Sequence, residues 1–156
     1  MMQLKVLNKR EAKRVHSILR ESYGVDNELE CSFLQSARDK LYAFTGDLSS
    51  PVLSRIRIDT IGLYFAAYDK KGLRLTIEGS QIIGPLAKKG IVELDHESAQ
   101  RWMKGEDVRI VSDNKGFVLV RHGNDYMGSG RIKNGLLINF VPKSRRVGAS
   151  FQSSQE

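Results

Sequence analysis

Apolar residues recur at helical spacing near the start of the chain and change to short, strand-like runs further on. Asn8 and Glu11 have the spacing of a capping box, and Gly24 follows the last apolar position of the periodic segment. The pattern therefore predicts a helix over residues 9–23. Positive side chains on the opposite face of this helix are more typical of ordinary solvation than of a binding ridge. Its buried face is predicted to consist of Val15, Ile18, Leu19 and Tyr23.

The next segment alternates short apolar runs with turn residues. Residues 31–35 and 40–46 are expected to pair as strands on either side of a charged turn. Ser50 before Pro51 is a favourable start for a short helix, because serine caps helices and proline fits the first helical position. Residues 59–79 are expected to form two further strands, joined by a turn at residues 69–72.

The second half predicts one helix and a group of closely spaced strands. Asp95 is placed to cap a helix that ends at Gly105, and its buried side would include Trp102. Four strands follow, with glycine or asparagine at their joints, and they suggest a compact barrel or half-barrel. The predicted strands are residues 108–111, 116–123, 126–132 and 136–141.

These elements predict an α+β protein made of two small packed units. The first sheet is expected to end at Glu78 and Gly79, so the division is placed between residues 1–78 and 79–147. Residues 148–156 are polar and are expected to be a frayed tail.

The distribution of charge says more about binding partners than the overall composition does. The chain has 156 residues and a formal net charge of +7, which indicates a polyanionic partner, nucleic acid first and an anionic membrane surface second. Five cations stand between Asp125 and Glu156, where there is no carboxylate at all. A surface that serves only solubility mixes both signs, so this one-sided stretch favours a binding role. The five are Arg131, Lys133, Lys143, Arg145 and Arg146.

Cysteine, histidine and carboxylate positions argue against several kinds of site. Cys31 is the only cysteine, so an internal disulfide is impossible, and no His or Cys spacing suits zinc. We expect Cys31 to be a small buried side chain and the scattered carboxylates to serve turns and helix ends, with no catalytic residue and no cofactor. Without a secretory signal or a run of about 20 apolar residues, the expected location is cytoplasmic, with no membrane partner.

Several motifs in residues 84–147 resemble those of the PUA domain, an RNA-binding module. The segment 105–108, Gly-Glu-Asp-Val, is similar to the glycine-acid turn that follows a helix in this family, and residues 116–135 are similar to its central hairpin and glycine-rich return strand. The nearest likeness is the PUA-like C-terminal domain of RNA cytosine-5 methyltransferases. The layout of the whole chain is similar to that of pre-PUA/PUA ribosome-biogenesis factors. The residues that match the C-terminal domain of the RNA cytosine-5 methyltransferases are Gly128, Gly130, Lys133, Asn134, Asn139, Pro142, Lys143 and Arg146.

The resemblance and the charges together predict which residues contact RNA. Arginine can grip phosphate with two hydrogen bonds, lysine supplies a mobile charge, and asparagine can read a base edge or a 2′-hydroxyl. Asn134 precedes Gly135, so a turn role competes with an RNA role, and a surface role competes likewise at His122. The predicted RNA-binding residues are Arg121, His122, Arg131, Lys133, Asn134, Asn139, Lys143, Arg145 and Arg146.

The sequence thus favours a non-catalytic protein that binds structured rRNA or tRNA during RNA maturation or ribosome assembly. In an alternative interpretation the chain is a protein-interaction module that docks an RNA-modification or ribosome-assembly protein. A third is an RNA-modifying enzyme whose site lies in residues 1–78, although no catalytic constellation is evident there.

Overall fold

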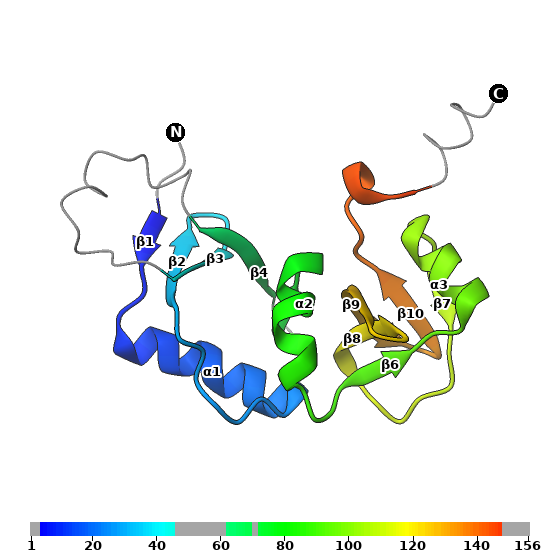
Figure 1. The fold of residues 1–156 in the computed structure, drawn as a ribbon, viewed down its shortest axis with the longest axis horizontal. Coiled ribbons are helices and arrows are strands. Elements are labelled where there is room, and N and C mark those ends of the chain that lie inside the picture. Colours follow the sequence, from blue (N-terminus) through cyan, green and yellow to red (C-terminus); the bar gives the residue numbers. More distant parts are fainter. Residues whose placement is uncertain (1–3, 46–61, 70–71, 148–156) are drawn as a thin grey trace.

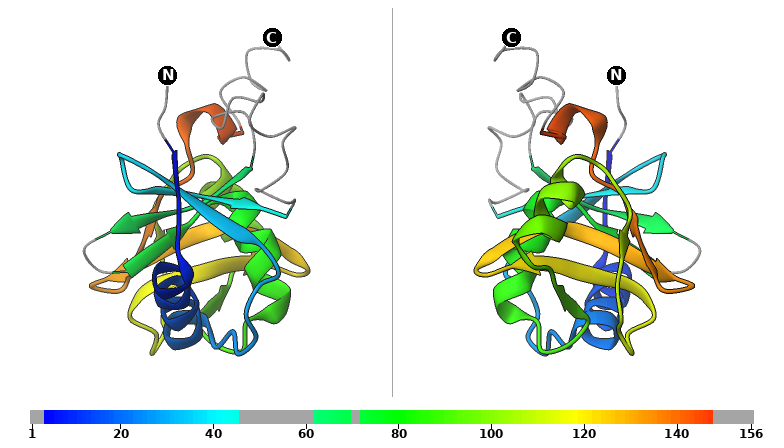
Figure 2. Two further views of the ribbon diagram at one scale, coloured as in Figure 1. Left: turned by 90° about the vertical axis from the view of Figure 1, so that its left-hand side faces the viewer. Right: turned by 90° about the vertical axis from the view of Figure 1, so that its right-hand side faces the viewer.

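The fold consists of two five-stranded sheets with a short helix between them. The structure is a computed structural model that describes residues 4–45, 62–69 and 72–147. Along the long axis of the molecule the first sheet, helix α2 and the second sheet follow one another (Figure 1). Helix α1 lies toward the viewer when the molecule is seen from one end of this axis, and α3 lies toward the viewer when it is seen from the other end (Figure 2). The predicted α+β class is confirmed.

Helix α1 (Lys9–Tyr23) has the predicted bounds, and its ends show why. The backbone N–H of Glu11 donates to Asn8 Oδ1 at 2.9 Å, and that of Asn8 donates to Glu11 Oε1 at 3.1 Å. These two bonds satisfy donors that the first helical turn leaves free, so the capping box is confirmed. Gly24 ends the helix with φ 68, a left-handed conformation that glycine adopts at little cost.

The first sheet is antiparallel and has the strand order β1-β2-β3-β4-β5. Its predicted strands are confirmed, whereas the short first strand was not foreseen. The helix predicted at Ser50 and Pro51 lies outside the described residues. The strands are β1 (Leu4–Val6), β2 (Ser32–Ser36), β3 (Lys40–Phe44), β4 (Leu63–Asp69) and β5 (Gly72–Leu75).

Helix α1 packs its apolar face on this sheet and forms the first core. Val15, Leu19 and Tyr23 are fully or almost fully buried there, together with Phe33 and Phe65 of the sheet. The Tyr23 hydroxyl donates to the Leu73 carbonyl at 3.1 Å, and burial raises the pKa of this phenol. The first core also contains Ile83 and Leu119, so it extends into the second half of the chain.

The expected end of the first sheet at Glu78 and Gly79 is wrong. Strand β5 ends at Leu75, and the next residues form helix α2 (Ile77–Ile83), capped by the Thr76 side chain, with a 3-10 turn η3 (Gly84–Leu86) behind it. The predicted division between residues 78 and 79 falls inside this helix, which contacts strands of both sheets. The division into two domains stays a prediction.

The second sheet has the order β6-β8-β9-β10-β7, with β6 parallel to β8 and the other pairs antiparallel. The four predicted strands are confirmed, and so is the helix capped by Asp95. The elements are β6 (Ile91–Glu93), α3 (His96–Met103), β7 (Val108–Arg109), β8 (Gly116–His122), β9 (Asp125–Lys133), β10 (Leu136–Asn139) and the 3-10 turn η4 (Lys143–Arg145).

The two faces of the second sheet are buried against different partners. Val118 and Val120 of β8 belong to a second core, which is built around the fully buried Trp102 of α3. Leu119, which lies between them, belongs to the first core. Because successive strand residues point to opposite faces, the second sheet is held between α3 on one side and the first half of the chain on the other.

Candidate nucleic-acid interface

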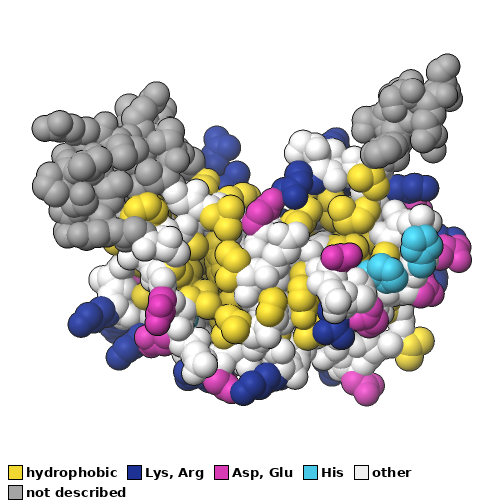
Figure 3. All heavy atoms as spheres, viewed as in Figure 1, with side chains coloured by type: hydrophobic (Ala, Val, Ile, Leu, Met, Phe, Trp, Pro, Cys, Tyr) yellow, Lys and Arg dark blue, Asp and Glu magenta, His cyan; other side chains and the backbone are white. Residues whose placement is uncertain are grey.

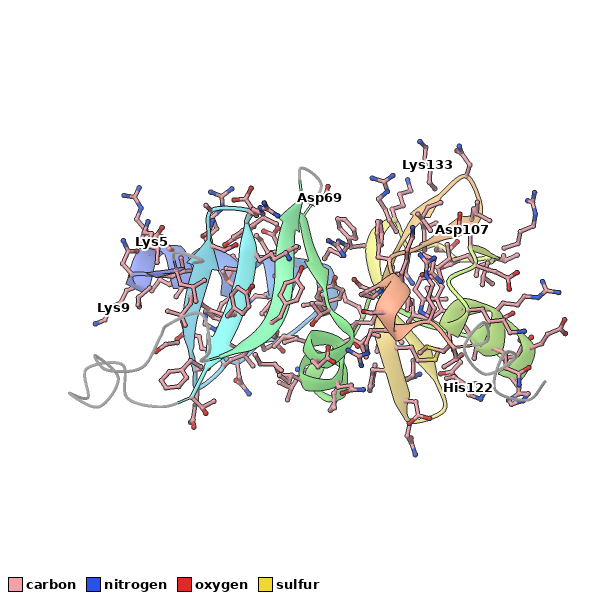
Figure 4. All side chains as sticks on the ribbon, turned by 90° about the horizontal axis from the view of Figure 1, so that it is seen from above. Lys5, Lys9, Asp69, Asp107, His122 and Lys133 are labelled. Carbon is pink, nitrogen blue, oxygen red and sulfur yellow. The ribbon has the colours of Figure 1, made fainter. Side chains whose placement is uncertain are left out.

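The nine predicted RNA-binding residues fall into three groups along the second sheet. The first group lies at the β8–β9 turn and the second at the β9–β10 hairpin, while the third consists of Asn139 at the end of β10 and the cations that follow it. His122 and Lys133 lie on opposite sides of the molecule in Figure 4, and the nine residues of β9 separate their turns by about 27 Å. The structure therefore does not gather the nine residues into one patch.

The first group, Arg121 and His122, is already engaged within the protein. Arg121 Nε donates to Glu93 Oε1 at 2.7 Å, and its guanidinium lies 5.9 Å from the centre of the Tyr126 ring. The Arg121 side chain, with the backbone N–H of Gly123, holds the pKa of the Glu93 carboxyl below its usual value. His122 Nδ1 lies 2.8 Å from the Leu94 carbonyl oxygen. The positive charge of Arg121 is thus largely offset.

The second group occupies the hairpin between β9 and β10. Asn134 and Gly135 form its two-residue turn with φ 53 and 74, which confirms the turn interpretation of Asn134. Lys133 is exposed beside this turn. Arg131 is only half-exposed and lies across from Phe117 of β8, and its Nε is buried without a hydrogen-bond partner among the described residues.

The third group is joined to the end of α3 by a network centred on Asn139. Asn139 Nδ2 donates to the carbonyls of Trp102 and Glu106, at 2.8 and 2.9 Å, and its Oδ1 accepts from the Val141 backbone N–H at 2.7 Å. Asp107 accepts from the Asn139 backbone N–H at 2.8 Å. The Asn139 side chain therefore positions the α3–β7 loop against the segment that carries the last cations.

Adjacent arginines in this segment point in different directions. The Arg146 side chain covers Gly105, so closely that a Cβ at this glycine would lie 2.3 Å from Arg146 Nε, and this Nε donates to the Val141 carbonyl. Arg145 instead forms an ion pair with Glu78 of α2. Lys104, which the sequence analysis missed, is exposed next to Gly105. We define the α3–η4 surface as Lys104, Lys143 and Arg146.

We predict that Asn139→Ala lowers the free energy of unfolding by about 2 kcal/mol, because it removes the three hydrogen bonds of the Asn139 side chain. Urea unfolding followed by circular dichroism measures the loss. Hydrogen exchange at Val141 and Val147 should quicken as well, since the segment after β10 loses its anchor. An unchanged unfolding midpoint together with unchanged exchange would contradict the positioning role of Asn139.

The structure also reveals a groove between the two sheets that the sequence did not suggest. Its volume is about 550 Å³, and it is lined by β3, β4 and β5 of the first sheet, by the start of α2, by β9 of the second sheet and by the segment after β10. Figure 3 shows hydrophobic side chains gathered in the upper middle of the molecule, with Lys or Arg side chains on both sides of them. The lining residues with aromatic rings or charges are Lys40, Tyr64, Arg74, Glu78, Phe140 and Arg145.

Other kinds of site find little support in the described part of the chain. No group of three or more His, Cys, Asp or Glu side chains gathers there in a way that could hold a metal ion. Cys31 is half-buried, and burial raises the pKa of its thiol, which disfavours the nucleophilic thiolate. Among the described helices none is both long and apolar enough to cross a bilayer.

Comparison with known proteins finds a family match in the second half of the chain. Residues 89–147 match the family described as the methyltransferase RsmF PUA domain. The chain is 32% identical to ribosomal RNA small subunit methyltransferase F of Aeromonas salmonicida over 144 residues, which is 88% of this chain and 30% of the relative. It is 33% identical to the protein of that name from Aliivibrio salmonicida over 139 residues, 83% of this chain and 28% of the relative. The chain thus spans about 30% of the length of these relatives.

A solved structure supports the fold over the whole chain. The crystal structure of a PUA domain from Aeropyrum pernix K1, a tartrate complex, superimposes with a TM-score of 0.56 at 14% identity. The match covers 100% of this chain and 92% of that one. The similarity extends beyond residues 89–147, so the first sheet and α1 also have counterparts in a known fold.

Proposed function

Residues 89–147 form a PUA-like domain, and from this premise we propose that the chain binds structured ribosomal RNA without performing chemistry itself. The observation that carries the proposal is the acid-free stretch after Asp125, which folds into β9, β10 and η4 and places Lys133 at the β9–β10 hairpin and Arg146 against Gly105, beside the end of α3. Within the described residues, Arg145 alone of these five cations belongs to an ion pair. Of the other four, Lys133, Lys143 and Arg146 are exposed and can contact phosphate.

The α3–η4 surface is the main contact in this proposal. Its two lysines are exposed, and Arg146 is held across Gly105 by its bond to the Val141 carbonyl, so its guanidinium is already ordered. An ordered arginine loses little conformational freedom when it binds phosphate. Lys133 at the hairpin turn is a second, separate contact. We assign Asn139 a positioning role, since its side chain is engaged by the protein.

The process is proposed from the relatives. The curated relatives named above are methyltransferases of small-subunit ribosomal RNA, and the chain aligns with only part of their length. We propose that this chain acts in the same process, small-subunit rRNA modification, in the cytoplasm. Proteins of rRNA modification or ribosome assembly are further proposed partners.

We predict that Lys104→Gln with Lys143→Gln lowers affinity for small-subunit rRNA fragments about tenfold or more at low salt. Each lost phosphate contact should flatten the plot of log affinity against log salt by about 0.7 to 0.9, so the pair should flatten it by about 1.4 to 1.8. Fluorescence anisotropy over a series of salt concentrations measures both effects.

The matched control is Lys9→Gln with Lys13→Gln, which removes the same charge from exposed positions in the first two turns of α1. If both pairs lower affinity and slope equally, RNA is attracted by net charge alone and the α3–η4 surface is not its contact. Binding whose affinity does not depend on salt would contradict phosphate recognition altogether.

A further inference from the structure

The groove between the two sheets has the chemistry of a site for unpaired bases. Two of its rings carry a cation: Lys40 Nζ lies 5.2 Å from the centre of the Tyr64 ring, and the Arg74 guanidinium lies 5.1 Å from that of Phe140. Tyr64 belongs to β4 of the first sheet and Phe140 follows β10 of the second. Both rings are only partly buried, and both line the groove.

The neighbouring rings brace this arrangement. Tyr42 lies beside Tyr64 with the ring centres 5.5 Å apart, and Phe117 lies 5.9 Å from Phe140. Their support comes from strands of the two sheets and holds the groove rings in place before any ligand arrives. A preformed aromatic surface loses little entropy when a base stacks on it.

The charge of the groove favours an anionic ligand. Lys40, Arg74 and Arg145 line it with three positive charges, and Glu78 is its one acidic residue among the described lining. Glu78 forms an ion pair with Arg145, so its carboxylate takes the place on the guanidinium that a phosphate could otherwise take. This ion pair joins α2 to η4 across the groove.

We infer that this groove binds an unpaired segment of RNA, with one or two bases stacked on Tyr64 and Phe140 and the adjoining phosphates held by Lys40, Arg74 and Arg145. The inference rests on the proposed RNA binding and adds a contact that is separate from both the α3–η4 surface and Lys133. A pocket of this volume accepts a nucleotide or two. Because only unpaired bases can stack on the two rings, the groove is expected to prefer unpaired RNA to duplex. Because stacking tolerates any base, its preference for one sequence over another should be weak.

The first test removes the rings and keeps apolar side chains. Tyr64→Leu and Phe140→Leu, made in the full chain, should each weaken binding of a single-stranded uridine decamer about tenfold, and the pair should weaken it more. The slope of log affinity against log salt should stay as in the unchanged protein, because stacking releases no counterions. A decamer carrying the fluorescent base 2-aminopurine should be quenched by the unchanged protein and not by the double variant.

The second test is expected to raise affinity, which partial unfolding cannot do. Glu78→Gln removes the groove's carboxylate and frees the Arg145 guanidinium, so the decamer should bind about threefold to tenfold more tightly. Glu30→Gln removes an equal charge from an exposed position in the first half of the chain and should change affinity far less.

The outcomes separate the groove from the proposed function. If the leucine variants bind the decamer normally, or if Glu78→Gln gains no more than Glu30→Gln, the groove does not hold RNA. A peptide or another ligand then fits it better, while salt-dependent rRNA binding through Lys104 and Lys143 still stands. If instead the unchanged protein binds neither rRNA fragments nor the decamer at any salt concentration, the proposed function itself is wrong.

Discussion

Gly79→Ala is expected to lower the free energy of unfolding by about 3 kcal/mol, although the same change in an ordinary helix is favourable. A Cβ at residue 79 would lie 2.0 Å from the Phe65 carbonyl oxygen and 3.1 Å from the Phe65 carbonyl carbon. This oxygen cannot withdraw easily, because it accepts hydrogen bonds at 3.0 Å from both the backbone N–H and the hydroxyl of Thr76. Helix α2 would have to move away from β4, and the contacts between the two sheets would loosen.

Gln81 in the same helix supplies the matched control. Its side chain is exposed, so Gln81→Ala should be more stable than Gln81→Gly by about 1 kcal/mol through helix propensity alone. Urea unfolding measures the effect of the methyl group at residue 79 as the difference between Gly79→Ala and the unchanged protein. The difference between Gln81→Ala and Gln81→Gly gives the same effect at residue 81. A stabilising methyl group at both positions would mean that α2 does not pack on Phe65 as the structure has it.

Helix α2 also shows where prediction from sequence stops. The two longer helices were predicted because their signals are local: an asparagine or aspartate cap, apolar residues at helical spacing and a glycine near the end. Helix α2 contains Gly79 and Ser80, which are poor helix formers. They are there for tertiary reasons, since Gly79 allows close approach to β4 and the Ser80 hydroxyl accepts from the Gly128 backbone N–H at 2.8 Å. A signal for the helix start was present in Thr76 and Glu78.

The strands could be predicted where recognisable turn residues separate them. Asn134 with Gly135 specifies a two-residue hairpin, and this turn length sets the register that pairs Lys133 with Leu136. Strand β1 was missed because it has three residues and is held by pairing with β2, which lies more than twenty positions away in the chain. Short edge strands of this kind depend on a partner and carry little pattern of their own.

The candidate site was predictable in composition and not in geometry. The absence of acids after Asp125 marked the cations, but it could not show that Arg145 turns to Glu78 while Arg146 lies over Gly105. The groove was invisible because its lining residues come from positions between 40 and 145 that no local motif links. An aromatic residue and a cation on neighbouring strands, as with Tyr64 and Lys40, are a usable signal only once the strand pairing is known.

Trp102→Ala is expected to be the most damaging single change in the second core, with a loss of about 4 kcal/mol or more. The Trp102 side chain is fully buried, and its Nε1 donates to the Met127 carbonyl at 2.9 Å. Its ring also lies against the backbone of β9, where a Cβ at Gly130 would come within 2.8 Å of the ring edge. Truncation leaves both a large cavity and an unpaired buried carbonyl, and these two costs add.

Trp102→Phe separates the two costs, since it keeps most of the ring and removes the N–H. It should lose about 1 to 2 kcal/mol, from the unpaired Met127 carbonyl and a small void. Circular dichroism during urea unfolding suits both variants, because Trp102 is the only tryptophan and cannot report its own removal. A loss for Trp102→Ala no larger than that for Trp102→Phe would show that the cavity closes by rearrangement of α3.

The same variants test whether the two sheets unfold together. Strand β8 contributes Val118 and Val120 to the second core and Leu119 to the first, so damage around Trp102 should reach α1 through this strand. We therefore expect hydrogen exchange in Trp102→Ala to quicken by a similar factor at Leu19 of α1 and at Val120 of β8. If exchange at Leu19 keeps the rate of the unchanged protein while that at Val120 rises, the second sheet opens by itself. The α3–η4 surface and the first-sheet side of the proposed groove site would then rest on separately stable parts of the chain.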